Sequence, residues 1–374
     1  MRVALVYDRV TKWGGAERVL VALHRLWPDA PLYTAVYDNK RARWADVFRV
    51  IPSFLQYIPF ANRLHELLPW ITPMAFESFS FDDFDVVISV TSAEAKGIIT
   101  KPNVLHICYC LTPTRYLWSG YDQYRKDAGL GVVNGIAGFW LTKLAPTLRV
   151  WDRVAAARPD TYVAISNRVK DRIKKYYDRT IQEVIYPPVE TALFSKQLLD
   201  MPNVSEPYFL TVSRLVGYKH VDVLIRAFNK SGQKLVIIGD GHQKKYLKQI
   251  ARSNIEFIDH HLTDLELVRY HQGCRAFVYA ADEDFGIAVV EAQASGKPVI
   301  AYSQSAVAES VLDGKTGILY HSQTPEALID ALKNFETMVF DPKRCRENAA
   351  QFDIKIFEKR MRQFVEHAYK KANI

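Results

Sequence analysis

Residues 283–302 read EDFGIAVVEAQASGKPVIAY, and this stretch decides the fold expected for the second half of the chain. The apolar residues of 287–295 have helical spacing, and Gly286 before them can take backbone conformations that let the chain approach a ligand closely. The Gly-Lys-Pro sequence at 296–298 ends the helix, and residues 299–302 have the composition of a buried strand. The stretch therefore predicts a glycine loop, a short helix and a strand of an α/β domain.

Two carboxylates lie eight positions apart in this stretch, at Glu283 and Glu291. Eight residues make about two turns of helix, so both carboxylates can face one cleft. The unpaired amides at the helix start would suit a hydroxyl-rich or anionic ligand. The alternative is a surface helix flanked by solvated acids, because charged residues usually lie outside.

The whole phrase resembles the signature of the family 4 retaining glycosyltransferases: an acidic residue before Phe285-Gly286, a second Glu, and a small-Gly-x-Pro-Val strand. The resemblance implies an α/β chain with the GT-B fold, in which two Rossmann-like doubly wound domains face a central cleft. It implies a nucleotide-sugar donor, with Glu291 on the ribose. Residues implied at the donor sugar or beside the ribose are Glu283, Asp284, Phe285, Gly286, Ile287 and Val290.

Length and composition agree with two soluble domains. The chain has 374 residues, of which 49% are hydrophobic and 24% charged. Its net charge of +8 favours an anionic partner such as a nucleotide diphosphate, nucleic acid or an anionic membrane surface. No run resembles an RNA-binding motif, so nucleic acid is the least favoured of these.

The four cysteines are scattered without metal-binding spacing, which indicates a reduced, cytoplasmic protein without a metal site. Neither a signal peptide nor a membrane-spanning run is expected. Any membrane contact should therefore be peripheral, on the inner face of the cytoplasmic membrane.

A strand at residues 3–7, two glycines and a helix from residue 16 to 26 open the chain. This order is the phosphate-binding arrangement of doubly wound folds, although two glycines can also serve only a tight turn. Gly14, Gly15 and Glu17 resemble the family's Gly-Gly-x-Glu loop. The resemblance implies that the glycines close over the donor diphosphate and that Glu17 lies on the acceptor side.

Further strands with intervening helices predict a parallel sheet in the first half, at residues 32–36, 47–51, 85–89, 105–109, 162–165 and 184–186. Pro187 and Pro188 stiffen the exit from this half. We therefore expect an acceptor-side domain at 1–188 and a nucleotide-sugar-binding domain at 189–354. The last helix, about 355–374, should pack back on the first domain, as the resemblance implies.

Residues 51–79 form an apolar, aromatic segment with few charges. The segment is either an internal hydrophobic cap or a surface that faces lipid or the acceptor.

The sequence HICYCLTPTRYLW at residues 106–118 departs from the family pattern. Relatives tend to have His where Leu111 stands, and leucine can neither donate a hydrogen bond nor carry charge. Arg115 and Tyr116 remain acceptor-side candidates, and His106 is expected to be a core histidine.

Arg214 and Lys219 follow a predicted strand at 208–213. Arg offers a bidentate fork to phosphate and Lys a point charge, although both residue types are mostly solvated. The phrase SRLVGYKHVDVLIRAF resembles the family's Arg-x4-Lys diphosphate site. Gly239 and Gly241, after the strand at 234–238, either approach the nucleotide or turn the chain.

The predicted function is transfer of a hexose with retention of configuration, with Glu283, Arg214 and Lys219 as catalytic residues. By resemblance the hexose is mannose from GDP-mannose, and the acceptor is a lipid-linked saccharide of surface polysaccharide or glycolipid synthesis. The nucleotide-sugar is a co-substrate, and no cofactor or metal is expected. Open alternatives are a UDP-sugar donor, a sugar-nucleotide epimerase or phosphorylase on the same fold, and a catalytically degenerate nucleotide-binding protein.

Overall fold

The chain folds into two compact units. In the computed structural model, unit 1 comprises Met1–Pro188 with Lys355–Ile374, and unit 2 comprises Val189–Ile354. The structure describes all residues except 59–69, 127–133, 182, 197, 199–205, 261 and 373–374.

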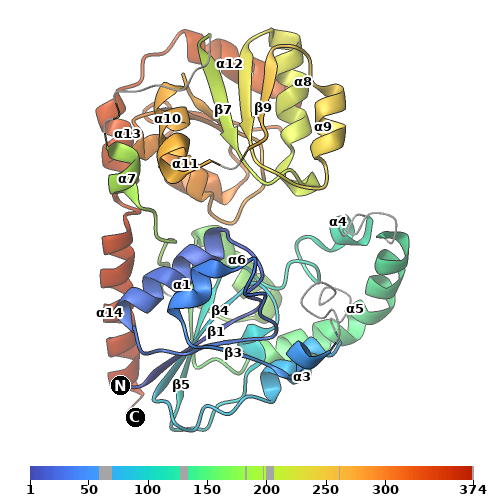
Figure 1. Ribbon diagram of the computed structural model, residues 1–374, viewed down its shortest axis with the longest axis vertical. Helices are drawn as coiled ribbons and strands as arrows, with labels where there is room; N and C mark the ends of the chain where they lie inside the picture. The colour runs from blue at the N-terminus through green and yellow to red at the C-terminus, as the bar shows by residue number, and fades with distance from the viewer. Residues whose placement is uncertain are drawn as a thin grey trace. The chain divides into compact units, whose positions relative to one another are not determined.

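Unit 1 is built on a parallel sheet whose strand order is β3-β2-β1-β4-β5-β6 (Figure 1). The strands are β1 Val3–Tyr7, β2 Leu32–Thr34, β3 Val50–Pro52, β4 Val86–Thr91, β5 Leu105–Cys110 and β6 Thr161–Ala164. Every residue of β1, β4 and β5 is buried, as the continuous apolar composition of parallel strands with two covered faces requires.

The helices in the described part of unit 1 are α1 Gly15–Leu26, α3 Thr72–Glu77, α4 Tyr121–Lys126, α5 Asn134–Ala156, α6 Asn167–Tyr177 and α14 Ile354–Lys371, whose first residue still belongs to unit 2. Short 3₁₀ turns are η1 Arg43–Val47, η2 Phe54–Tyr57 and η4 Ala95–Gly97. Helix α14 buries Phe357, Met361 and Val365, which recur every four residues and so share one helix face. The ring of Phe357 lies 5.8 Å from that of Tyr109 on β5.

Unit 2 repeats the plan, with the strand order β12-β11-β10-β7-β8-β9. The strands are β7 Tyr208–Val212, β8 Lys234–Ile238, β9 Ile255–Ile258, β10 Phe277–Tyr279, β11 Val299–Tyr302 and β12 Gly317–Tyr320. The helices and 3₁₀ turns are α7 Thr191–Ser195, η6 Gly217–Lys219, α8 Val221–Ser231, α9 Lys244–Ile250, α10 Asp264–Gly273, α11 Ile287–Ala294, η7 Ala306–Ser310, α12 Pro325–Glu336 and α13 Pro342–Ala350.

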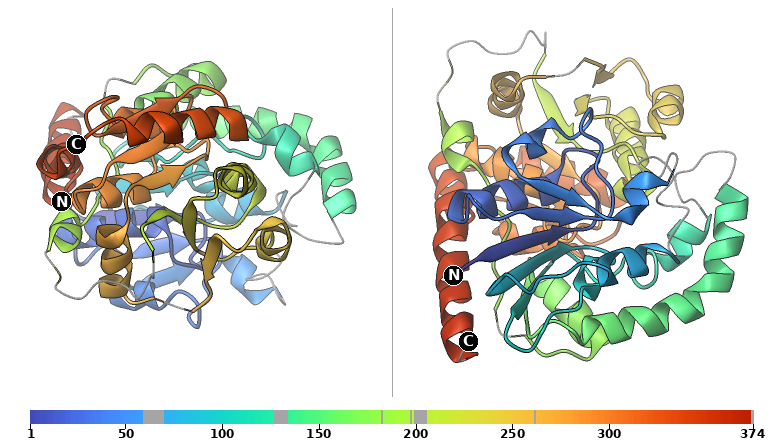
Figure 2. Two further views of the ribbon diagram at one scale, coloured as in Figure 1. Left: turned by 90° about the horizontal axis from the view of Figure 1, so that it is seen from above. Right: turned by 60° about the horizontal axis from the view of Figure 1, so that its bottom comes forward.

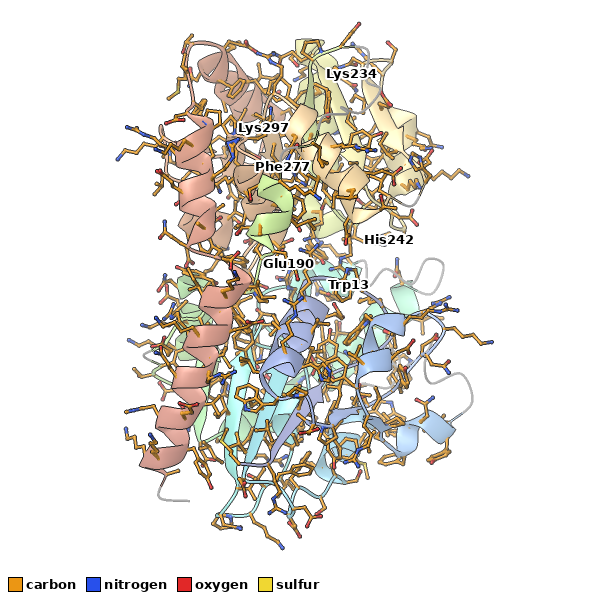
Figure 3. All side chains as sticks on the ribbon, turned by 60° about the vertical axis from the view of Figure 1, so that its left-hand side comes forward. Trp13, Glu190, Lys234, His242, Phe277 and Lys297 are labelled. Atoms are coloured by element: carbon orange, nitrogen blue, oxygen red, sulfur yellow. The ribbon has the colours of Figure 1, made fainter. Side chains whose placement is uncertain are left out.

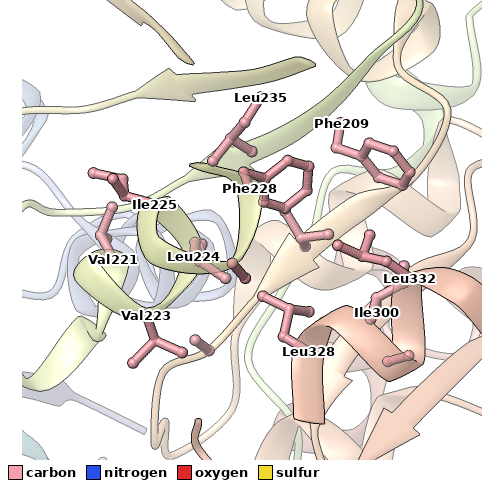
Figure 4. Packing of buried hydrophobic residues seen from close by; sticks show 14 of the residues in the cluster. Phe209, Val221, Val223, Leu224, Ile225, Phe228, Leu235, Ile300, Leu328 and Leu332 are labelled. Carbon is pink, nitrogen blue, oxygen red and sulfur yellow. The ribbon is translucent and has the colours of Figure 1, made fainter. Parts of the chain in front are cut away.

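One core of unit 2 lies between α8, α12 and the sheet (Figure 4). Helix α8 presents Leu224 and Phe228, one turn apart, and α12 presents Leu328 and Leu332. The ring of Phe209 on β7 lies 5.4 Å from that of Phe228, so strand and helix are joined through aromatic contact.

The strand predicted at residues 184–186 is wrong. Val184 forms an isolated bridge to Ala164 at the end of β6, and Ile185 donates its amide to the Ala164 carbonyl at 3.0 Å. Pairing stops there because Pro187 and Pro188 have no amide hydrogen to donate to a ladder.

In its described part, the apolar segment at residues 51–79 is partly buried in the core, as an internal cap would be, and partly exposed on the surface. Ile51, Leu55 and Phe76 pack into the unit 1 core. Tyr57 and Trp70 are exposed, at 88% and 54%. Part of the segment, including Phe60, lies outside the described residues. No helix in the described chain is both long and apolar enough to cross a membrane.

A buried ion pair ties α5 to η4, the 3₁₀ turn that follows β4. Lys96 donates to the Asp152 carboxylate at 2.6 Å and to the Thr114 hydroxyl at 3.0 Å. Trp118 donates its indole N–H to the other oxygen of Asp152 at 2.7 Å. Burial alone would lower the pKa of Lys96, but the Asp152 carboxylate more than offsets this and the pKa is raised.

We predict that Lys96→Ala lowers the free energy of unfolding of unit 1 by about 3 to 5 kcal/mol, because it leaves the Asp152 carboxylate buried without its cation. The exposed pair Lys101–Asp82 supplies the control, and Lys101→Ala should cost less than about 1 kcal/mol. All seven tryptophans belong to unit 1, so urea unfolding followed by tryptophan fluorescence measures this unit. Equal losses in the two variants would contradict the prediction.

The buried ring of His106 makes the free energy of unfolding depend on pH. This ring lies 2.8 Å from the Ser89 hydroxyl, and burial lowers its pKa to about 3. The unfolded chain takes up a proton near pH 6.5 that the folded state does not, so stability falls as the pH falls through this window. We expect a loss of about 2 kcal/mol between pH 7 and 5 in the wild type that is missing in His106→Gln. Parallel pH profiles of the two proteins would refute this.

Candidate functional site

The candidate site of unit 2 lies where β7 and β10 pair in parallel. Strand order reverses at this pair, since the chain runs outward from β7 to β8 on one side and from β10 to β11 on the other. Ligands of doubly wound sheets bind beyond the carboxyl ends of the strands at such a switch point. Arg214 and Lys219 follow β7, and Glu283 follows β10.

Lys219, Tyr279 and Glu283 form one cluster. The Lys219 ammonium pairs with the Glu283 carboxylate, which also accepts the Tyr279 hydroxyl at 2.8 Å. Lys219 lies 3.4 Å from the Tyr279 hydroxyl and 5.2 Å from the centre of the Tyr218 ring. The side chains of Lys219 and Glu283 are only 9% and 16% exposed, so little water screens this pair.

The backbone of Glu283 is fixed from its other side. Its amide donates to the Ser305 hydroxyl at 2.9 Å, and its carbonyl accepts the Ala306 amide at 3.1 Å. The loop after β10 is thus tied to the loop after β11, which holds the Glu283 carboxylate in place.

Arg214 is exposed and lies beside Tyr218. Its guanidinium donates to the Tyr218 hydroxyl and stands 5.6 Å from the ring centre. The two predicted cations therefore share one aromatic neighbour, Tyr218, in the loop that they flank.

Helix α11 begins as the sequence predicted. Gly286 has φ +91°, a conformation that favours glycine, and an added Cβ would lie 2.7 Å from Val307. Phe285 and Asp284 are buried before it, and Val290 and Glu291 are buried within the helix. Ile287 is the first helical residue, so its amide is among those without an intrahelical partner.

Gly239 and Gly241 support the Arg214 loop. A Cβ on Gly239 would lie 1.9 Å from the Ser213 carbonyl oxygen, and one on Gly241 would lie 2.3 Å from that of Leu215. Gly239 also has φ +149°. Close packing of two loops therefore explains both glycines, while their predicted contact with the nucleotide stays a prediction. Figure 3 labels His242, which directly follows Gly241.

The glycine loop of unit 1 leads into α1. Gly14 is extended and precedes the helix, and Gly15 is its first residue. Glu17 is buried, and its carboxylate accepts the Tyr7 hydroxyl at 2.6 Å. Burial and Glu17 raise the pKa of Tyr7 well above its usual value, which keeps this hydroxyl a donor. Glu17 thus ties α1 to β1.

Trp13 anchors the same loop from the side that precedes Gly14 (Figure 3). Its ring lies 6.1 Å from that of Trp44, and the Trp44 indole donates to the Lys12 carbonyl at 2.8 Å.

The acceptor-side candidates Arg115 and Tyr116 lie in the turn after β5. Tyr116 donates its hydroxyl to Glu94 at 2.5 Å, and Arg9 binds the other oxygen of that carboxylate at 2.8 Å. Arg115 accepts the Gly120 amide at its carbonyl. Leu111 is half-buried and donates its amide to the Thr91 carbonyl at 2.8 Å, so this position is also fixed by the backbone.

Three residues that contact predicted site residues were not themselves predicted. They are Tyr279, Tyr218 and Glu94. Tyr279 is one apolar residue of a short strand, and no spacing signals that its hydroxyl reaches a residue 60 positions away. Among the described residues, no group of three His, Cys, Asp or Glu could hold a metal ion.

Comparisons with known proteins relate the second unit to glycosyltransferases. Residues 201–352 match the family model described as glycosyl transferases group 1. An uncharacterized glycosyltransferase of Methanocaldococcus jannaschii is 28% identical over 218 residues, which cover 55% of this chain and 58% of that protein. The GDP-mannose-dependent alpha-(1-6)-phosphatidylinositol monomannoside mannosyltransferase of Mycolicibacterium smegmatis is 31% identical over 37% of this chain and 40% of its own. The matched segment spans less than two thirds of either relative.

Solved structures resemble the chain over nearly its whole length. Sucrose-phosphate synthase from Thermosynechococcus elongatus matches with a TM-score of 0.74 at 17% identity, over 99% of this chain and 100% of its own. Anabaena HepE in complex with UDP matches with a TM-score of 0.71 at 16% identity, over 98% and 100%. The prediction of a GT-B fold with two Rossmann-like domains is confirmed.

The loop packing predicts unequal costs for two glycine substitutions. Gly239→Ala should lower the free energy of unfolding of unit 2 by about 2 to 4 kcal/mol, because it adds a backbone clash to an unfavourable φ. Gly232→Ala is the control: Gly232 has φ +74° but open space around the added Cβ, so the cost should be only about 1 to 2 kcal/mol. Urea titration read by hydrogen–deuterium exchange of unit 2 peptides measures both. If Gly239→Ala and Gly232→Ala had the same urea midpoint, the loop at Gly239 would not be packed tightly against the loop at Ser213.

Proposed function

We propose that this protein is a retaining, metal-independent hexosyltransferase that uses a nucleotide-sugar donor and a lipid-linked saccharide acceptor in surface polysaccharide or glycolipid synthesis. The observation that carries the proposal is the Lys219–Glu283 pair at the switch point between β7 and β10. The pair lies within the residues that match the group 1 glycosyltransferase model. In this proposal the protein works peripherally at the inner face of the cytoplasmic membrane.

The chemistry asks chiefly for stabilisation of a leaving group. Breaking the anomeric carbon–oxygen bond expels a nucleoside diphosphate, and negative charge builds on the departing oxygen. Arg214 can bind phosphate oxygens through two N–H groups, and Lys219 adds a second positive charge at the same loop. Because Lys219 is buried, its charge acts with less screening than a solvated lysine would.

The carboxylates have separate roles in this proposal. Glu283 accepts hydrogen bonds from sugar hydroxyls and orients the ring, while Tyr279 and Lys219 hold its carboxylate in place. Glu291 binds the ribose hydroxyls, and the amides around Phe285 and Gly286 bind the sugar. Gly14, Gly15 and Glu17 of unit 1 keep their predicted diphosphate and acceptor roles.

We propose GDP-mannose as the donor. Support comes from the sequence phrases noted above and from the relative in Mycolicibacterium smegmatis, which is named as GDP-mannose-dependent. A UDP-sugar is the second candidate, since HepE with a similar fold was solved with UDP.

A thermal-shift panel with GDP, UDP, ADP, GDP-mannose, UDP-glucose and NAD tests the donor site. A ligand that binds only the native state stabilises it, by about 2.7 kcal/mol when the ligand concentration is one hundred times its Kd. This added stability raises the melting temperature. A shift with GDP and GDP-mannose supports mannose transfer, and a shift with UDP and UDP-glucose selects the second candidate. A folded protein without any shift would contradict the donor site and direct attention to Leu111→His.

We predict that Arg214→Ala lowers the turnover of sugar transfer by about 100-fold, the scale of losing one group that stabilises transition-state charge. Arg214 is exposed, so the substitution should leave the fold intact. Arg226→Ala on α8 is the matched control, since Arg226 is exposed and pairs only along its helix with Asp222 among the ion pairs described. A loss below about threefold for Arg214→Ala would mean that the diphosphate binds elsewhere.

Product analysis separates the rival activities. Transfer of labelled mannose to a lipid extract supports the proposal. Conversion of the donor to another sugar nucleotide without an acceptor would instead indicate an epimerase, and release of a sugar phosphate would indicate a phosphorylase. Nucleotide binding without any conversion would indicate a degenerate site.

A further inference from the structure

Helix α5 of unit 1 has two apolar faces. One face is covered by its own chain: Leu148 and Ala145 are buried against the turn at Leu117, with Trp118 and Tyr121 packed beside them. The opposite face is exposed. Its side chains are Ile136, Phe139, Trp140, Lys143, Val150 and Val154, here called the α5 stripe.

The spacing places the α5 stripe on one line. Five of its members, at 136, 140, 143, 150 and 154, are three, four or seven positions apart, so at 3.6 residues per turn they follow one side of the helix for about 27 Å. Phe139 lies at the edge of this line, one turn from both 136 and 143. The five apolar members are between 55% and 65% exposed. Figures 1 and 2 show the first part of α5 extending away from the strands of unit 1, beside α4.

This exposure is unusual for a soluble helix. A helix that is apolar all round is normally buried, and large contiguous exposed apolar surfaces mark interaction sites. Phe139 and Trp140 add two aromatic rings, which bury much area and favour sites with one apolar and one wet side. The two rings contact each other, with their centroids 5.8 Å apart.

The charge around the stripe is positive. Lys143 lies within it, 5.9 Å from the Phe139 ring centre. Arg149 and Arg153 add positive charge on the same helix, but they lie over the Trp118 ring, which belongs to the covered face. The acid of α5, Asp152, is fully buried and paired with Lys96. Asp152 therefore does not offset the positive charge of the exposed cations of α5.

A neighbouring element extends the apolar surface. Glu77 on α3 accepts the Trp151 indole N–H at 3.0 Å and pairs with Arg158 at 2.7 Å, which holds α3 beside α5. Met74, one turn before Glu77, is 59% exposed, and Trp70 is 54% exposed.

We infer that the α5 stripe is a docking surface for an anionic lipid membrane, with the apolar side chains inserted at the headgroup boundary and Lys143 at the lipid phosphates. Cationic amphipathic surfaces with Trp and Phe bind such interfaces through buried apolar area and charge. A symmetric dimer through the stripe is disfavoured, because a two-fold interface would bring the cations of one copy against those of the other.

The inference deepens the proposed function, since it assigns the surface that meets the membrane of a lipid-linked acceptor. Its test needs no sugar donor. Failure of nucleotide binding and failure of membrane binding are therefore separate results.

The test is flotation of the full chain with vesicles of phosphatidylglycerol and phosphatidylcholine, and with phosphatidylcholine alone. The wild type should bind the anionic vesicles, and added salt should weaken binding. The double variant Phe139→Ser/Trp140→Ser should bind at least about tenfold more weakly, and Lys143→Glu should reduce the preference for anionic lipid. Matched controls in unit 2 are Val339→Ser, at a residue 98% exposed, and Lys343→Glu, which should both bind like the wild type.

A labelled variant keeps the test independent of the stability of the double variant. All four native cysteines are buried, so Ile136→Cys can be labelled selectively with a polarity-sensitive fluorophore. Its emission should shift to shorter wavelength with anionic vesicles, and the same label in Val339→Cys should not respond.

Three results would overturn the inference. They are a wild type that binds neither vesicle, a double variant that binds as tightly as the wild type, and an Ile136→Cys label that does not respond to vesicles that the protein binds. A concentration-dependent dimer in sedimentation that Phe139→Ser/Trp140→Ser abolishes, without vesicle binding, would show that a second copy covers the stripe. Trp70→Ser separates the two surfaces: if this variant loses binding while the α5 stripe variants do not, the membrane contact lies at Trp70, before α3, and not at the stripe.

Discussion

Parallel pairing of β7 with β10 is the constraint on which the candidate site depends. These strands lie side by side although β8 and β9 separate them in the chain, because the connections run outward in opposite directions. The loops after both strands therefore emerge at one edge of the sheet. Lys219 meets Glu283 for this reason, and neither residue would otherwise come near the other. Unit 1 has the same reversal at β1 and β4, where Asp8 accepts the Thr91 hydroxyl and the Ser92 amide.

Close backbone packing makes this edge rigid. Gly239 and Gly241 let the loop after β8 lie directly against the carbonyls of the loop that carries Arg214. Ser305 and Ala306 fix the Glu283 backbone, and Tyr279 fixes its carboxylate. In the proposed sugar transfer, groups that are already placed would stabilise the developing charge without further ordering during the reaction.

Helix α5 follows a different principle. Its covered face is anchored by a buried ion pair between Asp152 and Lys96, with Thr114 and Trp118 as further donors. Such a pair contributes little net stability over an apolar core but fixes the orientation of the helix strongly, because any rotation would leave a charge buried alone. The same orientation keeps the α5 stripe directed outward.

The sequence by itself determined the class of fold and the local elements of the site. The ranges 234–238 and 299–302 are strands as predicted, and Gly286 precedes α11. The strand predicted at residues 184–186 was wrong because a β-branched apolar run has the composition of a strand whether or not a neighbouring strand can pair with it. Strand β12 was missed because it begins with Gly317, and glycine is depleted in strands and typical of turns.

Only the tertiary structure decided which side chains meet. Tyr279 with Lys219, Lys96 with Asp152 and Arg9 with Glu94 are each separated by more than fifty positions in the chain. Short-range periodicity can say which face of an element is apolar, but it holds no information on which distant element will cover that face. Exposure of the α5 stripe is the same case: its composition predicts a helix, and only the packed structure leaves one apolar side uncovered.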